Sequence, residues 1–436
     1  MTSLNGGEHV IRAANTTGDF ERAARLRDEL VDTLRSRGKI VSPAVEKAFR
    51  TVARETFVPP GTPLEEVYAV DRAVVTKTDE HGRSLSSVSA TYIQARMIEM
   101  ADIHPGMAVL EIGSGGYNAA LLAEIVGPDG YVVSIDIDSE IVERAGALLS
   151  RTGYGGRVSV VHADAEYPVP GFGPFDRTLV TVGAWDIPPA WLDQLVADGV
   201  LVVPLRMNGI TRTIAFRRDG DHLTSSDAEV AGFVPIQGQG AHTERTFLLP
   251  DPNGARLWLQ FDSGAPEEIR LLDGVLATES VSVWSGVTIG KGISFADLHL
   301  WLAAFLPGFC RISADPGTDL AAKLGKTWFP FGGVVGGSFA YLAVRPAMDD
   351  TGVEFGATAH GGRAAAIALV EQIQAWDRTG RHRSPSFGFW PAGSTVPKLP
   401  EPSAVLHKRH GAVSISWLPA SQNTPIIRPR RVGGVN

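Results

Sequence analysis

The run from Val109 to Ala119, V-L-E-I-G-S-G-G-Y-N-A, constrains the fold of this chain more than any other stretch. An apolar strand ends at Ile112, three glycines follow within four positions, and a helix is expected to begin near Tyr117. Glycines let the backbone turn sharply and approach a ligand, and the first N–H groups of a helix are free to bind it. We therefore expect a ligand site at the end of this strand.

The acidic residue of the strand, Glu111, distinguishes between cofactors. A carboxylate two positions before the first glycine would repel a pyrophosphate but can bind the ammonium group of an amino-acid tail, as in S-adenosylmethionine. The dinucleotide pattern G-x-G-x-x-G also fails, because Asn118 stands where the third glycine belongs. S-adenosylmethionine is favoured over NAD, with Gly113, Ser114 and Gly115 as expected contacts.

Two more carboxylates follow at the ends of the next predicted strands. Asp136 lies some twenty residues beyond the glycines and suits a ribose diol. Asp164 can accept a hydrogen bond from an adenine amino group. A single carboxylate of this kind could equally be a solvated strand-end residue. Three at successive strand ends favour a nucleoside, so we include Asp136, Asp164 and the residues that follow them, Ile137 and Ala165, in the cofactor site.

Composition bounds the class of protein. The 436 residues include 48 acidic and 40 basic ones, and this net charge of −8 disfavours a nucleic-acid partner. The length predicts two domains. The single cysteine, Cys310, excludes an intrachain disulfide, and no apolar run predicts a signal peptide or a membrane span. We expect a cytoplasmic protein without membrane contact or a metal site; its oligomeric state stays open.

Hydrophobic periodicity predicts the organisation of the chain. Helices are expected over 19–37, 42–54 and 92–100, with an irregular segment over 59–89. Strands over 109–112, 131–136, 157–162, 177–182 and 200–204 then alternate with helices, and closing strands are expected over 211–216 and 230–235. This alternation predicts a doubly wound, Rossmann-like α/β sheet with its ligand at the carboxyl ends of the strands.

Beyond a plausible linker at Pro250–Gly254 the alternation stops. We predict a catalytic domain over 1–250, an α+β domain over 251–418 and a flexible tail over 419–436. The glycine-rich run 331–338 lacks the Gly-Lys-Ser/Thr of a phosphate loop, so it is interpreted as a turn or a packed strand.

Motifs of the first 250 residues carry a family resemblance. They are Leu30–Gly38, Val52–Pro59, Tyr68–Ala73, Ser86–Met97, Pro174–Asp176, Pro188–Ala190, Gln194–Leu195, Leu201–Pro204 and Phe233–Pro235. With them the chain resembles the protein-L-isoaspartate O-methyltransferases, whose substrate-loop motif Q-T-I-S-Q-P-Y-I-x-A-x-M corresponds to Ser86–Met97. The resemblance implies an S-adenosylmethionine-dependent methyltransferase fold, Ser89 as the active-site serine, and Ser87, Val88 and Ala90 as substrate contacts.

The departures from the family pattern suggest an unusual substrate. The glycine loop is one residue shorter than G-x-G-x-G-Y, and Ser86 and Thr91 replace a glutamine and a proline, which is expected to change the substrate-binding surface. About 185 residues also follow the point where repair-type members usually end. This combination looks like the variant group associated with ribosomally made, modified peptides, whose members methylate an aspartate in a constrained precursor peptide. Repair of isoaspartyl proteins is the alternative.

An acceptor carboxylate is already ionised at neutral pH, so the reaction needs alignment more than a base, and alignment can supply about 7–11 kcal/mol. The Ser89 hydroxyl can donate one hydrogen bond to that carboxylate. The ester then closes to a succinimide, which hydrolyses to aspartate and isoaspartate. A methyltransferase for small molecules or nucleic acids, or a non-catalytic S-adenosylmethionine-binding protein, would share the cofactor site and stays an alternative.

Overall fold

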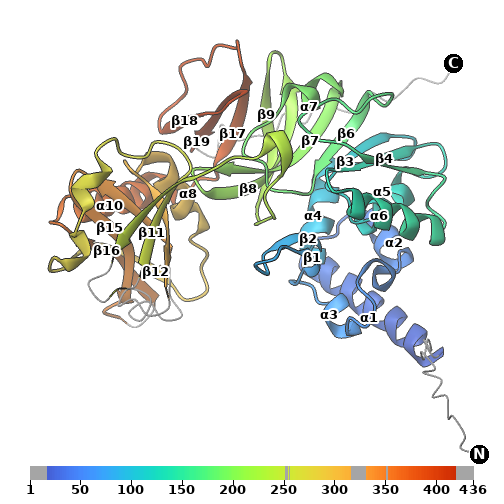
Figure 1. Ribbon diagram of the computed structural model, residues 1–436, viewed down its shortest axis with the longest axis horizontal. Coiled ribbons are helices and arrows are strands. Elements are labelled where there is room, and N and C mark those ends of the chain that lie inside the picture. The colour runs from blue at the N-terminus through green and yellow to red at the C-terminus, as the bar shows by residue number, and fades with distance from the viewer. Residues whose placement is uncertain (1–16, 251–253, 255, 316–329, 350–351, 419–436) are drawn as a thin grey trace, which may run out of the picture. The chain divides into compact units, whose positions relative to one another are not determined.

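The computed structural model describes residues 17–250, 254, 256–315, 330–349 and 352–418 (Figure 1). The described residues form two compact units that alternate along the chain. The first unit contains the described residues of 1–107, 114–134 and 138–161. The second unit contains residues 108–113 and 135–137 and the described residues from 162 onward. The predicted tail over 419–436 lies outside the described residues.

The first unit is mainly helical. Its helices are α1 (Thr17–Ser36), α2 (Pro43–Thr51), α3 (Leu64–Val67), α4 (Thr91–Ala101), α5 (Tyr117–Val126) and α6 (Ser139–Arg151). The start of α2 confirms the sequence analysis: the Ser42 side chain accepts a hydrogen bond from the Val45 N–H, and Pro43 occupies the first turn, where its missing N–H costs nothing.

The prediction of an irregular segment over 59–89 was wrong in its second half. Strands β1 (Val74–Thr78) and β2 (Ser84–Val88) form an antiparallel hairpin there. The charged run between them is the turn, in which the Asp79 carboxylate accepts hydrogen bonds from the N–H groups of His81 and Arg83. An aspartate that bonds to its own turn backbone stabilises such a connection, a signal that the charge pattern obscured.

Ten strands of the described chain form one sheet in the order β18-β19-β17-β9-β8-β7-β6-β3-β4-β5. Its first seven strands along the chain are β3 (Ala108–Ile112), β4 (Tyr131–Asp136), β5 (Val158–His162), β6 (Phe175–Val180), β7 (Leu195–Met207), β8 (Ile210–Asp219) and β9 (His222–Val230), and α7 (Pro189–Asp193) precedes β7. Strands β3, β6 and β7 are parallel, and β8 and β9 close the series antiparallel. The mixed α/β fold is confirmed.

The expected strand over 230–235 was wrong, because β9 ends at Val230 and only Pro235 makes an isolated bridge, to Gly183. The bridge consists of the Gly183 N–H donating to the Val234 carbonyl and the Ile236 N–H donating to the Gly183 carbonyl, and it uses no N–H at residue 235, where a proline has none to donate.

Three late strands join this sheet: β17 (Ser386–Pro391), β18 (Ser403–His407) and β19 (Gly411–Ser416). Strand β17 pairs with β9 through Gly388↔Thr224 and Phe389↔Leu223. Part of the region 251–418 therefore extends the larger sheet, while the domain boundaries given above stay a prediction.

A second sheet has the order β10-β11-β13-β14-β15-β16-β12. Its strands are β10 (Arg245–Pro250), β11 (Arg256–Phe261), β12 (Val281–Gly290), β13 (Cys310–Ala314), β14 (Phe331–Val335), β15 (Ser338–Pro346) and β16 (Gly352–His360). Helix α10 (Ala364–Ala375) packs against β12, β15 and β16, and α8 (Ala296–Phe305) packs against α10 (Figure 1).

This second sheet bears on two sequence interpretations. Strands β10 and β11 pair with Pro250 opposite Arg256, so both sides of Pro250–Gly254 belong to one sheet, contrary to the linker interpretation. The glycine run 331–338 forms β14 and the turn into β15, which confirms a packed strand and turn. Among the described helices, none is long and apolar enough to cross a membrane.

Candidate active site

In the turn that follows β3, the backbone of Gly113 lies very close to Thr181. Gly113 has a φ of +93°, and its N–H donates to the Ile135 carbonyl at 2.9 Å. A Cβ atom on Gly113 would lie 2.6 Å from Thr181 Oγ1. That hydroxyl is within hydrogen-bond distance of the carbonyl oxygens of Ile112 (3.0 Å) and Gly113 (2.9 Å). Only glycine fits here, because both the dihedral angle and the space exclude a side chain.

The three glycines of the turn are not equivalent. Gly116 precedes α5 with a φ of +84°, and a Cβ there would lie 3.0 Å from the Phe57 ring. At Gly115 a Cβ would meet nothing within 4 Å. The sequence analysis named Gly113 and Gly115 as cofactor contacts, whereas steric necessity falls on Gly113 and Gly116. The neighbouring Ser114 and Glu111 are both buried, Glu111 completely.

The second unit brings together the ends of β4 and β5. The Asp136 carbonyl accepts a hydrogen bond from the Ala163 N–H at 3.0 Å, and the Ile137 carbonyl lies 2.9 Å from His162 Nε2. Asp136 itself is partly exposed at the end of β4. This arrangement places Asp136 and Ile137 beside the segment that leads to Asp164.

Asp164 is held by two backbone donors. Its Oδ1 accepts from the Glu166 N–H and its Oδ2 from the Gln239 N–H, each at 2.9 Å. A Cβ on Gly238 would come within 2.4 Å of both Asp164 Oδ2 and Ile137 Cδ1, so the segment around Gly238 lies directly on these two residues. The sequence analysis missed this segment; the closely spaced Gly238 and Gly240 were the available signal.

Ala165 is buried beside Asp164, and its carbonyl accepts a hydrogen bond from the Trp191 indole N–H at 2.7 Å. Within the second unit, four of the predicted cofactor residues thus lie on two neighbouring segments, Asp136 and Ile137 on one and Asp164 and Ala165 on the other.

In the first unit, the segment around Ser89 connects β2 to α4. Ser87 and Ser89 are partly exposed, whereas Val88 and Ala90 are buried. The backbone is fixed by Arg54, whose guanidinium donates to the carbonyl oxygens of Ser89 at 2.8 Å and Val88 at 3.3 Å.

Arg54 is completely buried and also donates to the Val67 carbonyl and to Gln94 Oε1, each at 2.8 Å. Its guanidinium carbon lies 4.9 Å from the centre of the Tyr117 ring, which favours the cation. Burial lowers the pKa of this guanidinium. Arg54 lies inside the family motif Val52–Pro59. Its burial could not be predicted from the sequence, because arginines are mostly exposed in folded proteins.

The two unusual residues of the substrate-loop motif point inward. Ser86 is buried and its Oγ accepts a hydrogen bond from Thr76 Oγ1 at 2.9 Å. Thr91 is buried and its hydroxyl lies 3.2 Å from the Val70 carbonyl. The expectation that they change the substrate-binding surface is corrected: they change the internal bonding of the first unit.

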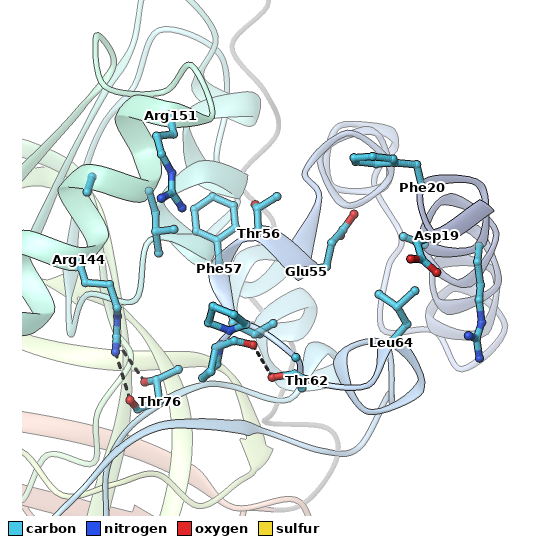
Figure 2. Close-up of a pocket in the computed structure, with 18 residues that line it drawn as sticks. Asp19, Phe20, Glu55, Thr56, Phe57, Thr62, Leu64, Thr76, Arg144 and Arg151 are labelled. Carbon is cyan, nitrogen blue, oxygen red and sulfur yellow. Dashed lines mark hydrogen bonds between the residues drawn. The ribbon is translucent and has the colours of Figure 1, made fainter. Parts of the chain in front are cut away.

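A cavity of about 820 Å³ also lies in the first unit, between the start of α1, the segment 55–64 and α6 (Figure 2). Arg144 donates from one side of it to the Thr76 carbonyl at 3.2 Å and to the Thr76 hydroxyl at 3.1 Å. None of the predicted site residues lines this cavity. In the described ranges, no cluster of three His, Cys, Asp or Glu residues could hold a metal ion.

Comparisons with known proteins give consistent matches. The family model "Protein-L-isoaspartate(D-aspartate) O-methyltransferase (PCMT)" matches residues 25–241. A protein-L-isoaspartate O-methyltransferase of Methanopyrus kandleri is 40% identical over 182 residues, which cover 42% of this chain and 77% of the relative. One from Hyperthermus butylicus is 35% identical over 233 residues, covering 51% of this chain and 93% of the relative. A solved structure of the same name is 28% identical, with a TM-score of 0.45, and the match covers 54% of this chain and 84% of that one.

The turn geometry predicts unequal effects of two alanine substitutions. Gly113→Ala must relieve both a positive φ and the contact with Thr181, so we expect it to lower the free energy of unfolding by about 1–3 kcal/mol. Gly115→Ala, the matched control, should change it by no more than about 0.5 kcal/mol. Denaturant titrations of the purified variants measure both values, and equal losses would contradict this account of the turn.

Proposed function

The chain belongs to the protein-L-isoaspartate O-methyltransferase family, and from this premise we propose that it transfers a methyl group from S-adenosylmethionine to a carboxylate of a peptide or protein. The observation that carries the proposal is the Gly113 turn, which lies within the residues matched by the family model and admits no side chain on the backbone facing Thr181. The turn follows the carboxyl end of β3, and ligands of open α/β sheets bind at the carboxyl ends of the strands.

The cofactor site takes its parts from the strand ends. Glu111 binds the ammonium group of the methionine tail, with Gly113, Ser114 and Gly115 alongside it. Asp136 accepts from the ribose hydroxyls, and Asp164 from the adenine amino group, with Ile137 and Ala165 as apolar neighbours. The two backbone N–H groups that donate to Asp164 support its role, because they fix the orientation of its carboxylate.

Methyl transfer then forms a bond between a carboxylate oxygen and the methyl carbon, while the bond from that carbon to sulfur breaks and S-adenosylhomocysteine leaves. The acceptor is ionised at neutral pH, so no residue has to remove a proton. Ser89 donates a hydrogen bond that orients the acceptor, and Ser87, Val88 and Ala90 contact the substrate. Arg54 supports this assignment because it holds the carbonyls of Val88 and Ser89 in place.

The acceptor that we favour is an aspartate side chain in a ribosomally made, conformationally constrained precursor peptide. The residues beyond 241, which the family model does not match, support this choice because they provide surface for a larger substrate. Closure of the ester by the next backbone nitrogen would release methanol and give a succinimide, which water opens to aspartate or isoaspartate. Repair of isoaspartyl proteins uses the same chemistry on a different acceptor and is the second candidate.

A peptide comparison separates the two acceptors. One sequence is prepared in three forms: aspartate in a closed ring, aspartate in the linear chain, and isoaspartate in the linear chain. We expect the ring to be methylated at least about tenfold faster than the linear isoaspartyl form, because a constrained peptide loses less conformational entropy on binding. Mass spectrometry follows the gain of one methyl group and the later loss of methanol.

Faster methylation of the linear isoaspartyl form would establish repair instead. Cofactor binding without methylation of any form would support the non-catalytic alternative.

Ser89 is tested by its alanine variant. Ser89→Ala should lower kcat by about ten- to a hundredfold, since one hydrogen bond to the reacting group is lost, and should leave the Kd for S-adenosylmethionine within twofold. Ser84→Ala, in the same hairpin, serves as the matched control and should keep its kcat. Unchanged kcat in Ser89→Ala would remove this hydroxyl from the reaction.

Arg54 is tested by a variant that keeps its charge. Arg54→Lys replaces a planar set of five donors by a single ammonium group, which cannot serve four acceptors arranged around a guanidinium. We expect kcat to fall about tenfold while the Kd for S-adenosylmethionine changes less than twofold. Arg144→Lys, in the neighbouring cavity, is the control; equal effects of the two variants on kcat would contradict the role of Arg54.

A further inference from the structure

The turn between β18 and β19, residues Lys408–His410, reaches the strand ends of the second unit. The Lys408 ammonium group donates to the Arg206 carbonyl at 2.8 Å and lies 4.3 Å from the centre of the Trp185 ring. Lys408 is enclosed, and burial lowers its pKa to about 8. These contacts anchor the turn beside the segment that follows β6.

His410 provides a second anchor. Its backbone N–H donates to Asp186 Oδ2 at 2.6 Å, and its Nε2 lies 2.7 Å from Glu166 Oε1. Glu166 is the residue whose own N–H donates to Asp164. The turn is therefore attached on both sides, to the segment after β5 and to the segment after β6.

Arg409, between these anchors, holds the segment that covers Asp164. Its guanidinium donates to the Gln239 carbonyl at 2.7 Å and to the Ala241 carbonyl at 3.4 Å. The N–H of Gln239 in turn donates to Asp164 Oδ2. A cavity of about 310 Å³ lies alongside, lined by Glu166, Gln239 and Arg409 among others, so the turn also forms a wall of open space next to these residues.

We infer that Arg409 is a positioning residue for the nucleoside end of the cofactor site: it holds Gln239 so that its N–H fixes the Asp164 carboxylate toward the adenine. The inference rests on the proposed function, in which Asp164 contacts the adenine amino group. The Lys408–His410 turn lies beyond residues 25–241, which the family model matches. By this inference the turn supports binding of the methyl donor, in addition to the role in peptide binding proposed for the late region. Without Arg409 the segment around Gly238 can move away from Asp164. Binding of S-adenosylmethionine must then restore the orientation of the Asp164 carboxylate, which weakens the affinity.

The inference is tested on the full chain by calorimetry with S-adenosylmethionine. The Arg409 side chain is 46% exposed, so water competes with its hydrogen bonds and the expected loss is moderate. We expect Arg409→Ala to raise the Kd about five- to tenfold and Arg409→Lys to raise it less. The matched control is Arg378→Ala, an exposed arginine of the same region, which should leave the Kd unchanged.

A second variant reaches the same segment independently. Gly238→Ala introduces a Cβ that would lie 2.4 Å from Asp164 Oδ2, so the segment must move. Gly238→Ala should also raise the Kd for S-adenosylmethionine. In the double variant with Arg409→Ala, the Kd should rise by less than the product of the two single fold-changes, because both substitutions disturb the contact between Gln239 and Asp164.

In steady-state assays of Arg409→Ala, the KM for S-adenosylmethionine should rise, while the KM for the peptide and the melting temperature should stay at their wild-type values.

The outcomes are distinguishable. If the wild-type chain does not bind S-adenosylmethionine, the proposed function fails and this inference with it. If the wild type binds and Arg409→Ala binds equally well or more tightly, the inference alone is overturned. An equal rise of both KM values, or a lowered melting temperature that accounts for the loss, would show a general structural role and would also overturn it.

Discussion

The close approach between Gly113 and Thr181 is the constraint on which the ligand end of the larger sheet depends. The Thr181 N–H donates to the Ile112 carbonyl, and its hydroxyl reaches the next carbonyl, so the ends of β3 and β6 are joined by side chain as well as backbone. A side chain at residue 113 would separate them. Because β3 carries Glu111 and leads into the turn, this contact fixes the point at which the strand ends and the turn begins.

In the first unit, a buried cation fixes the backbone. The Arg54 guanidinium is removed from water, and it donates hydrogen bonds to four neutral oxygens and lies against the Tyr117 ring. A buried arginine costs free energy unless its donors are satisfied, so this residue is better explained by the geometry that it imposes than by the stability that it contributes. That geometry is the backbone path through Val88 and Ser89.

Local signals predicted most of the α/β region correctly. Period-two and period-3.6 apolar patterns placed β3, β4 and α4 within a few residues, and Ser42 with Pro43 marked the start of α2. The glycine turn was also predictable, because glycines directly after an apolar strand indicate positive φ angles such as that of Gly113. The contact of Gly113 with Thr181 was not, since Thr181 is distant in sequence. Which of Gly115 and Gly116 is sterically required could not be predicted from spacing, since the difference depends in part on Phe57, which is distant in sequence.

Contacts between distant segments lay outside what the sequence could predict. Nothing in Ser386–Pro391 shows that it pairs with β9, since an apolar alternating run fits any sheet edge. The same holds for Arg409 and Gln239, which are 170 residues apart. The signals for Asp164 were local, but the segment that fixes it becomes visible only when the β18–β19 turn is placed.

The pairing of β17 with β9 also determines how the late region can be studied. An unpaired β9 would present open N–H and C=O groups and the apolar side chain of Leu223, which is buried opposite Phe389. Exposed edges of this kind promote aggregation. A chain ending near Pro250 would lack β17 and would also split the β10–β11 pair. Loss of activity in such a truncation would therefore report damage to two sheets, and the contribution of the late region to recognition has to be measured through single side chains in the full chain.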